Sequence, residues 1–190
     1  MSLEIEKQKT ALVVIDLQKG VAQRQTAPYS PAQVIENAAA LAAAFRAAGA
    51  PVFLVRVTPS PDRKDALHPK SDTSWPVSTP PPDWANLVPE MGPKPGDFVI
   101  TKRQWGAFYG TELDLQLRRR GMTSIVLCGI ATEIGVESTA RDAYERGYEQ
   151  VFARDAMAGI TPESHHHTIE RIFPRMGQVR STAEILEAMK

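Results

Sequence analysis

The chain has 190 residues, with 22 basic and 22 acidic side chains and therefore a formal net charge of zero. The length suits one domain with a substantial core, and the balanced charge leaves no global field that would attract nucleic acid or an anionic membrane. One cysteine excludes an internal disulfide framework, and no apolar run approaches the ~20 residues that span a bilayer. The charged start MSLEIEKQK is unlike a signal peptide. We therefore expect a single cytoplasmic domain, 1–190.

Short apolar runs alternate with helical patterns along the chain, and this order predicts an α/β fold. The apolar runs lack a clean alternation of apolar and polar residues, as expected of strands that helices cover on both faces. We therefore predict a Rossmann-like, three-layer α/β/α architecture with a central, mostly parallel six-stranded sheet. Its strands are expected at Ala11–Ile15, Val52–Val57, Asp97–Thr101, Ser124–Cys128, Gln150–Ala153 and Gln178–Arg180.

Capping residues mark the expected helix boundaries. Ser30 and Gln33 have the spacing of a capping box, and Gly49 ends the Ala-rich helix that they begin. Thr111 is expected to cap a helix that ends near Gly121. Further helices are expected at about Glu133–Gly147, from Thr161–Glu163 onward, and from Ser181 or Thr182 onward.

The segment 58–96 differs from the rest of the chain, because it holds 10 of the 15 prolines and no obvious helix or strand pattern. A long segment of this kind is usually functional or disordered. One interpretation is a surface excursion that the prolines stiffen. The other is a lid or subunit-contact segment over a ligand crevice, in which Trp75 and Trp84 would be the side chains most worth burying.

The stretch 125–143, IVLCGIATEIGVESTARDA, is typical of a buried strand, a Gly-led turn and a helix that begins near Glu133. Backbone N–H groups at a helix N-terminus can stabilise an anion. Two other strand ends carry charge, since Asp16 closes one apolar run and Lys102 follows another. Because ligands bind at the carboxyl ends of parallel strands, we expect Asp16, Lys102 and this turn to converge on one crevice.

Asp16 and Lys102 each have a purely structural interpretation as well. Asp16 could organise the turn after its strand, and Lys102 could be solvated beside Arg103. Their common placement at strand ends favours a functional pair, in which Lys102 anchors Asp16 and a substrate carboxylate or developing negative charge. The pKa of Asp16 stays open, because desolvation would raise it while Lys102 would lower it.

Other residues near the expected crevice have less specific patterns. Trp105, Phe108 and Tyr109 could wall an apolar substrate face or could belong to the core. The Thr132 hydroxyl is expected to cap the helix that follows it. Cys128 lies within an apolar strand and is expected to be a buried, inert thiol.

These segments resemble the isochorismatase-like hydrolase superfamily, also called the cysteine hydrolases, from residue 11 to about residue 189. The resemblance rests on Asp16 in VVIDLQKG, Lys102 in TKRQWGAF and the turn GIATEIGVESTARDA. The nucleophilic cysteine of that family pattern falls at Gly135. In this respect the chain is similar to true isochorismatases and to a group of bacterial hydrolases with a GVEST-like run.

The resemblance implies a non-proline cis peptide bond between Ile130 and Ala131, which would aim backbone N–H groups, including that of Gly135, at a developing oxyanion. We therefore expect Ile130 and Ala131 to bind substrate together with Trp105 and Phe108. Related folds are usually dimers or tetramers, so a homodimer or homotetramer is also implied.

Because Gly135 carries no nucleophile, the covalent route of the cysteine members is closed. The resemblance then implies non-covalent hydrolysis of a small organic molecule, which could be a vinyl ether, an amide or an ester. In this hypothesis Asp16 is the general acid/base, Lys102 its electrostatic partner, and the Gly135 region the oxyanion or substrate-carbonyl site. The main alternative is an inactive hydrolase-fold protein that binds a small metabolite, and a pure assembly role through the segment 58–96 is a third.

Two more specific activities have less support. Isochorismatases carry Tyr-Ala-His where this chain has Ala131-Thr132-Glu133, and Glu133 would bring negative charge near the mouth of the site, although it also suits the first turn of a helix. Nicotinamidase-like relatives hold a metal with an Asp-x-His motif that RVTPSPDRKDALH lacks. The histidines 165–167 are neighbours on a helix and are expected on its solvated surface, so we expect neither metal nor cofactor.

Overall fold

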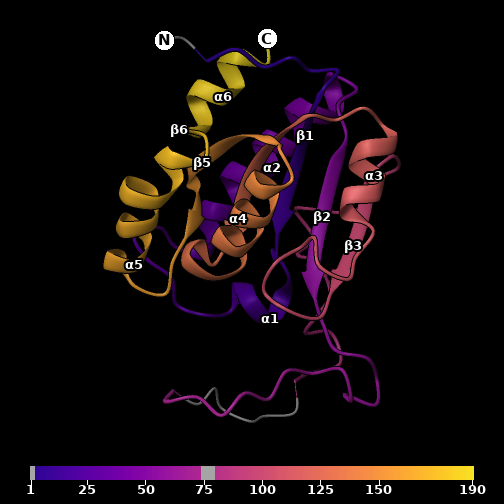
Figure 1. The fold of residues 1–190 in the computed structure, drawn as a ribbon, viewed down its shortest axis with the longest axis vertical. Coiled ribbons are helices and arrows are strands. Elements are labelled where there is room, and N and C mark those ends of the chain that lie inside the picture. Colours follow the sequence, from indigo (N-terminus) through magenta and orange to yellow (C-terminus); the bar gives the residue numbers. More distant parts are fainter. Residues whose placement is uncertain (1–2, 74–79) are drawn as a thin grey trace.

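The structure is a computed structural model that describes residues 3–73 and 80–190, so Trp75 lies outside the described residues. The described chain forms one six-stranded sheet in the order β3-β2-β1-β4-β5-β6, and all neighbouring strands are parallel (Figure 1). The predicted parallel sheet is therefore confirmed. The strands are β1 Thr10–Ile15, β2 Val52–Val57, β3 Phe98–Lys102, β4 Ser124–Ile130, β5 Glu149–Ala158 and β6 Gln178–Arg180.

Helices cover both faces of this sheet. The α-helices are α1 Lys19–Ala22, α2 Pro31–Ala47, α3 Leu113–Arg119, α4 Glu137–Glu145, α5 Pro162–His167 and α6 Thr182–Ala188. Two π-helical turns and one 3-10 turn are η1 Thr132–Val136, η2 Thr168–Ile172 and η3 Phe173–Arg175. The capping box predicted at Ser30 is present and begins α2, and a second capping box, at Ser181, begins α6. Within residues 3–73 and 80–190, no helix combines the length and the apolar character needed to cross a membrane.

The side chains of β1 alternate between two cores, because successive residues of a strand point to opposite faces of the sheet. Leu12 and Val14 pack with side chains of α2 and α6, whereas Ala11, Val13 and Ile15 pack with side chains of α3 and α4. Every residue of β1 is buried. Helices on both faces thus explain the continuous apolar run, and the three-layer architecture is confirmed.

Several predicted boundaries differ from the structure, and three of the differences matter most for the site. β3 is shifted by one residue, so Lys102 closes the strand instead of following it. β5 continues to Ala158, past an irregularity in its register with β4 between Leu127 and Gly129. The helix predicted at 133–147 begins with the π-helical turn η1 before α4 continues it. Such single-turn π segments occur often at functional sites.

Gly129 permits a close approach of β4 to β1 at the carboxyl edge of the sheet. Its φ is +126°, and a Cβ built on it would lie 2.1 Å from the carbonyl oxygen of Ile15. No L-side chain fits either the backbone conformation or the space. The edge of the sheet therefore depends on glycine at this position.

We predict that Gly129→Ala lowers the free energy of unfolding by ~3 kcal/mol or more, because the Ile15 backbone would have to move away. Gly147→Ala is the matched control, since its φ of +78° is also positive but no atom lies within 4 Å of its added Cβ. We expect that control to lose only ~1 kcal/mol. Urea unfolding measures both variants, and equal losses would contradict this account.

Candidate active site

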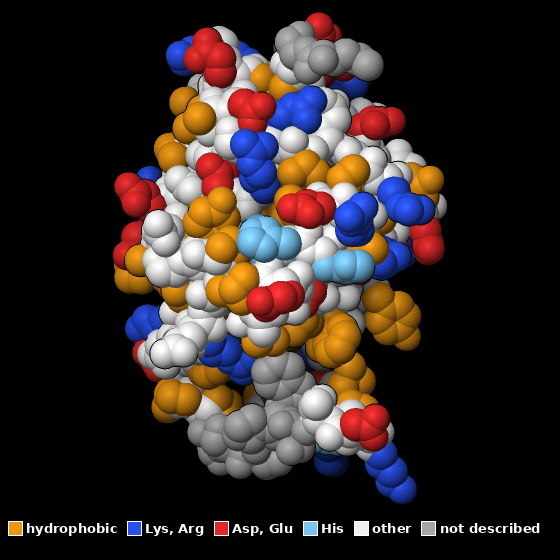
Figure 2. Space-filling view, turned by 90° about the vertical axis from the view of Figure 1, so that its left-hand side faces the viewer, with side chains coloured by type: hydrophobic (Ala, Val, Ile, Leu, Met, Phe, Trp, Pro, Cys, Tyr) orange, Lys and Arg blue, Asp and Glu red, His pale blue; other side chains and the backbone are white. Residues whose placement is uncertain are grey.

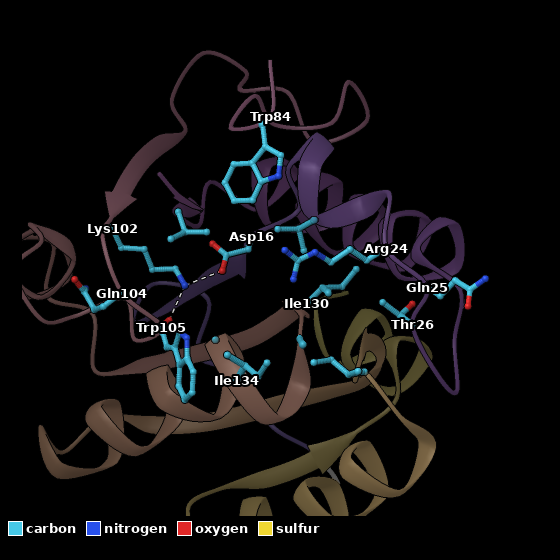
Figure 3. A pocket seen from close by; sticks show the side chains of 15 residues that line it. Asp16, Arg24, Gln25, Thr26, Trp84, Lys102, Gln104, Trp105, Ile130 and Ile134 are labelled. Atoms are coloured by element: carbon cyan, nitrogen blue, oxygen red, sulfur yellow. Dashed lines mark hydrogen bonds and ion pairs between the residues drawn. The ribbon is translucent and has the colours of Figure 1, made fainter. Parts of the chain in front are cut away.

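Asp16 and Lys102 form a buried ion pair at the carboxyl edge of the sheet (Figure 3). Lys102 Nζ lies 2.7 Å from Asp16 Oδ2 and donates a second hydrogen bond, of 2.6 Å, to the carbonyl oxygen of Trp105. The Lys102 and Asp16 side chains are only 1% and 8% exposed. The predicted convergence of these two strand ends is therefore confirmed.

The strand order explains how two residues 86 positions apart meet. β2 lies between β1 and β3, and Lys102 is in register with Val57, two residues beyond the Val55 that pairs with Ile15. The Lys102 side chain consequently has to reach past the end of β2. Its four-carbon stem makes lysine suited to this span.

Asp16 has a left-handed backbone conformation, with φ of +53°. This region is uncommon for residues other than glycine, although aspartate tolerates it better than most. Neighbouring backbone groups enforce it, since the Asp16 N–H donates to the Val55 carbonyl at 2.9 Å and the Asp16 carbonyl accepts from the Gln18 N–H at 2.8 Å. Backbone strain held by its surroundings in this way is concentrated at functional positions.

Burial raises the pKa of Asp16 to about 6, although the charge and hydrogen bond of Lys102 act in the opposite direction. Desolvation therefore decides the balance that the sequence left open. The other carboxyl oxygen, Oδ1, is buried and has no hydrogen-bond partner among the described residues. A carboxyl group with a raised pKa and an unoccupied oxygen is suited to exchange a proton with a bound molecule.

Gly135 lies directly beside this ion pair. A Cβ built on Gly135 would be 3.2 Å from Asp16 Oδ2, 3.3 Å from Lys102 Nζ and 3.0 Å from Cγ2 of Ile15. Residue 135 thus occupies the position from which a side chain would touch both charged groups. A cysteine here would be in reach of Asp16, and the glycine leaves that place without a nucleophile.

The turn before Gly135 has the cis peptide bond between Ile130 and Ala131 that the resemblance implied. The N–H groups of Ile134 and Val136 both donate to the Ala131 carbonyl, at 3.1 and 3.2 Å. These two donors are therefore used within the turn. An oxyanion site would have to use other N–H groups of η1, such as that of Gly135.

Two predictions are wrong near His165, namely the exposed position of His165 and the capping role of Thr132. His165 is buried, and its Nδ1 shares a 2.8 Å hydrogen bond with the Thr132 hydroxyl, so Thr132 does not cap the following helix. Burial, with a smaller effect of His166, lowers the pKa of His165 to about 4. His166 and His167 are exposed as predicted, and Figure 2 shows histidine side chains on the face that carries α5. Among the described residues, no group of three or more His, Cys, Asp or Glu side chains is arranged to hold a metal ion.

The ion pair opens onto a cavity of about 280 Å³ (Figure 3). Most of its wall is apolar and includes the side chains of Val21, Val57, Trp84, Trp105, Ile130 and Ile134. A few polar groups in a mostly apolar concave surface are typical of small-molecule sites. The cavity therefore suits a small molecule whose reactive group faces Asp16 and whose remainder is largely apolar.

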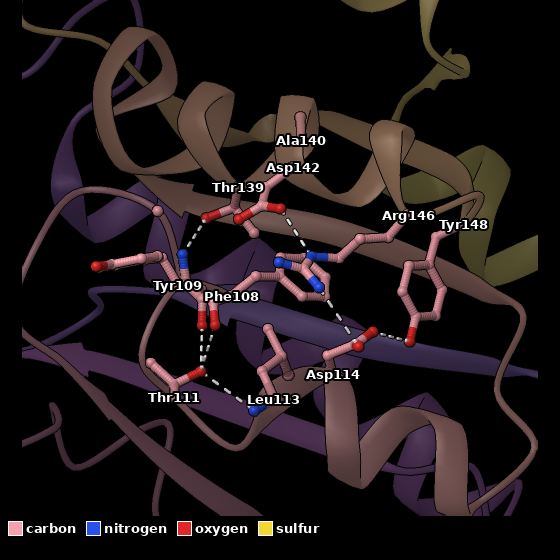
Figure 4. Close-up of polar contacts among 12 residues, drawn as sticks. Phe108, Tyr109, Thr111, Leu113, Asp114, Thr139, Ala140, Asp142, Arg146 and Tyr148 are labelled. Atoms are coloured by element: carbon pink, nitrogen blue, oxygen red, sulfur yellow. Dashed lines mark hydrogen bonds and ion pairs between the residues drawn. The ribbon is translucent and has the colours of Figure 1, made fainter.

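Three of the four residues predicted to bind substrate line this cavity, namely Trp105, Ile130 and Ala131. Phe108, the fourth, does not line the cavity. Its ring is buried in the core, 5.7 Å from the ring of Tyr148 (Figure 4). The loop after β3 turns Phe108 toward the core beneath α3 and α4, whereas Trp105 faces the cavity and is 58% exposed.

Cys128 and Glu133 have structural surroundings. Cys128 is buried, and burial raises the pKa of its thiol to about 12, which excludes a reactive thiolate at neutral pH. Glu133 does not line the cavity, because its carboxylate accepts a 2.8 Å hydrogen bond from the N–H of Ile160, a rim residue.

Trp84 reaches the cavity through contacts that the sequence analysis missed. The Trp84 carbonyl accepts from the Gly20 N–H at 2.9 Å and from Gln18 Nε2 at 3.3 Å. A Cβ on Gly20 would lie 1.9 Å from Cδ1 of Trp84, so the indole occupies the space that the glycine leaves. The sequence contained one indication of these contacts, because Gln18 and Gly20 follow Asp16 within four residues.

The two parts of the Pro-rich segment 58–96 thus lie in different surroundings. Its second part brings Trp84 onto the cavity, which favours the interpretation of this part as a cover for the crevice. Its first part extends away from the body of the protein in Figure 1, and residues 61–65 are exposed. The described residues of the segment contain no helix or strand.

The three-layer fold, with an ion pair and a cavity at the carboxyl edge of its sheet, places the protein among α/β proteins that bind small molecules at that edge. The family profile described as "Isochorismatase domain" matches residues 10–184. The chain therefore belongs to the isochorismatase family, a family of hydrolases.

Similar proteins agree with this assignment. The chain is 50% identical over 191 residues to the isochorismatase family protein YwoC of Bacillus subtilis (strain 168), with 100% and 98% of the two chains covered. It is 33% identical over 219 residues to the ureidoacrylate amidohydrolase RutB of Methylobacterium radiotolerans, with 98% and 82% covered. The structure of an isochorismatase family protein from Burkholderia thailandensis matches with a TM-score of 0.93 and 44% identity, covering 99% and 97% of the chains.

The Gly20–Trp84 contact can be tested without a substrate. In a background with Trp75→Phe and Trp105→Phe, Trp84 is the single tryptophan, since the chain has three. We predict that Gly20→Ala shifts the fluorescence maximum of Trp84 to longer wavelength, because the added Cβ displaces the indole into solvent. Gly110→Ala, where no atom lies within 4 Å of the added Cβ, is the control and should leave the maximum unchanged. An unchanged maximum in Gly20→Ala would contradict the proposed packing.

Proposed function

We propose that this protein hydrolyses a small organic molecule without a covalent enzyme intermediate, with Asp16 as general acid/base and Lys102 as its electrostatic partner. The observation that carries the proposal is the unoccupied Oδ1 of Asp16 beside a formed cavity, next to a residue 135 that has no side chain. Water is then the nucleophile, because Gly135 offers none and Cys128 is inert. This assigns the chain to the members of the superfamily with glycine in place of the cysteine.

The ionised form of Asp16 suits amide or ester hydrolysis. Asp16 Oδ1 takes a proton from water as the water oxygen bonds to the substrate carbonyl carbon, and the carbonyl oxygen becomes an oxyanion. Lys102 and the N–H of Gly135 would stabilise that negative charge. Asp16 then returns the proton to the leaving nitrogen or oxygen as its bond to carbon breaks.

The protonated form of Asp16 suits a vinyl ether instead. The acid delivers its proton to the terminal vinyl carbon, and water adds to the resulting oxocarbenium carbon. The hemiketal that forms then collapses to a carbonyl compound and an alcohol. Lys102 would keep the conjugate base of Asp16 in place for the return of a proton.

Amides are the first class to test. RutB is by name an amidohydrolase, and the similarity to it covers 98% of this chain. The mostly apolar wall favours amides with an apolar body. Esters and vinyl ethers of similar size complete the panel.

The second candidate is a protein that binds a small metabolite without converting it. The absence of a side chain at Gly135 favours it, because the usual nucleophile of the fold is missing while the cavity remains. It predicts saturable binding of a ligand that is recovered unchanged after long incubation. The hydrolase proposal predicts product.

Asp16→Asn tests the proposed role of the carboxyl group. We predict a fall in kcat of about 10²–10⁴-fold on any substrate found, since general acid–base catalysis contributes on that order. Asp97→Asn is the matched control, because the Asp97 side chain is only 2% exposed and lies 2.7 Å from a cation, Arg46, outside the cavity. The control should lose stability but retain the kcat of its folded fraction. Turnover by Asp16→Asn within a few-fold of the parent protein would rule out the assignment.

The pH dependence of kcat/KM reports the ionisation of Asp16 in the free enzyme. With the pKa of Asp16 raised to about 6, activity should fall as pH rises through 6 if the acid form reacts, and fall as pH drops through 6 if the carboxylate reacts. Lys102→Met should move the midpoint to higher pH, because it removes the charge that lowers this pKa. A profile that is flat between about pH 5 and 7 would contradict the role of Asp16.

A further inference from the structure

Thr139 joins two parts of the candidate site, the Gly135 turn and the loop that holds Ala107, which lies 32 residues before Thr139. It lies in α4 with its side chain fully buried, facing the loop that carries Phe108 and Tyr109 (Figure 4). Its hydroxyl donates to the Gly135 carbonyl at 2.6 Å and accepts from the Ala107 N–H at 3.1 Å. The single hydroxyl oxygen therefore serves both as donor and as acceptor.

The Ala107 end of this bridge leads to Lys102. Ala107 belongs to the loop that follows β3, and the carbonyl of Trp105 in the same loop accepts the second hydrogen bond of Lys102 Nζ, at 2.6 Å. The loop also packs directly on α4, since a Cβ built on Gly106 would lie 3.6 Å from the Ser138 carbonyl oxygen. A shift of the loop would therefore move an acceptor of the Lys102 ammonium.

The Gly135 end of the bridge leads to the other side of the ion pair. The Gly135 turn lies next to Asp16 and Lys102, because a Cβ built on Gly135 would be 3.2 Å from Asp16 Oδ2 and 3.3 Å from Lys102 Nζ. The contacts thus form a closed circuit, from Asp16 through Lys102 and the β3 loop to Thr139, and back through Gly135.

A threonine in a helix often donates to the carbonyl four residues earlier, and that bond alone would be an ordinary local contact. The bond from Ala107 is different in kind. It is made by a buried backbone N–H of a distant loop, and such a group has to find an acceptor when it is removed from water. Serine could replace the hydroxyl here, whereas valine, of nearly the same shape, could not.

We propose that Thr139 is a positioning residue of the active site, whose hydroxyl holds the Gly135 turn against the loop that fixes Lys102. The expected effect on turnover rests on the proposed function, whereas the expected effect on the geometry of the ion pair does not. Loss of the hydroxyl lets the loop and the turn separate. Lys102 then loses its Trp105 acceptor and is held less closely to Asp16.

The test compares Thr139→Val with Thr139→Ser and uses Thr182→Val as control. Thr182 is also buried, and its hydroxyl donates to Asp155 at 2.8 Å, outside the cavity. The first measurement needs no substrate. The Asp16 carboxyl carbon is titrated by ¹³C NMR, with its signal assigned by its absence in Asp16→Asn.

We expect Thr139→Val to raise the titration midpoint of Asp16 by about half a pH unit or more, because Lys102, the cation that lowers it, is less well held. Thr139→Ser and Thr182→Val should keep the midpoint of the parent protein. On any substrate found, kcat should fall about tenfold or more in Thr139→Val with a smaller change in KM, and Thr139→Ser should restore it.

An unchanged midpoint in folded Thr139→Val would overturn the proposal, as would equal shifts in the valine and serine variants. If Thr139→Val does not fold, Thr139→Ala and Thr139→Ser provide the same comparison, because only the serine keeps the hydroxyl. If no substrate is hydrolysed by the parent protein, the proposed function fails. The titration result still decides the role of Thr139.

Discussion

The buried ion pair between Asp16 and Lys102 is the interaction on which the rest of the site depends. Removing two charges from water is costly, and mutual attraction offsets that cost only with good geometry and additional hydrogen bonds. Here the Trp105 carbonyl supplies one such bond to Lys102, while Asp16 Oδ1 is left without a partner. The Lys102 ammonium therefore has two acceptors, whereas one oxygen of Asp16, a residue that lines the cavity, has no hydrogen-bond partner among the described residues.

Glycines mark the places where separate parts of the chain meet around this pair. Gly20 leaves room for the Trp84 indole, Gly129 lets β4 approach Ile15, and Gly135 leaves room beside the two charges. An added Cβ would lie 1.9 Å from the Trp84 indole at Gly20 and 2.1 Å from the Ile15 carbonyl oxygen at Gly129, so a side chain at either position would displace its neighbour. The cavity is thus formed by close backbone contacts between elements that are distant in sequence, and these contacts explain how Asp16 stays buried beside its cation.

Much of this could be predicted from the sequence, because it depends on backbone pattern and topology. Apolar runs placed the strands, and parallel pairing required Asp16 and Lys102 to lie at the same edge. Side-chain direction was harder to predict. Phe108 and Trp105 belong to the same loop, yet one enters the core and the other lines the cavity, and His165 is buried although its two neighbours are exposed. Tertiary contacts that no local pattern encodes accompany these cases, such as the hydrogen bond of His165 with Thr132 and the packing of Phe108 against Tyr148.

The central claim is that the ion pair is present for its chemistry and not to hold the fold together. The most direct measurement is the free energy of unfolding at pH 7 of the double variant Asp16→Asn/Lys102→Met, which removes both charges together. The account predicts a variant at least as stable as the parent protein. The variant loses the attraction between the two ions, but it also avoids the cost of removing both ions from water. A loss of ~3 kcal/mol or more would show that the pair stabilises the fold, and would contradict the claim.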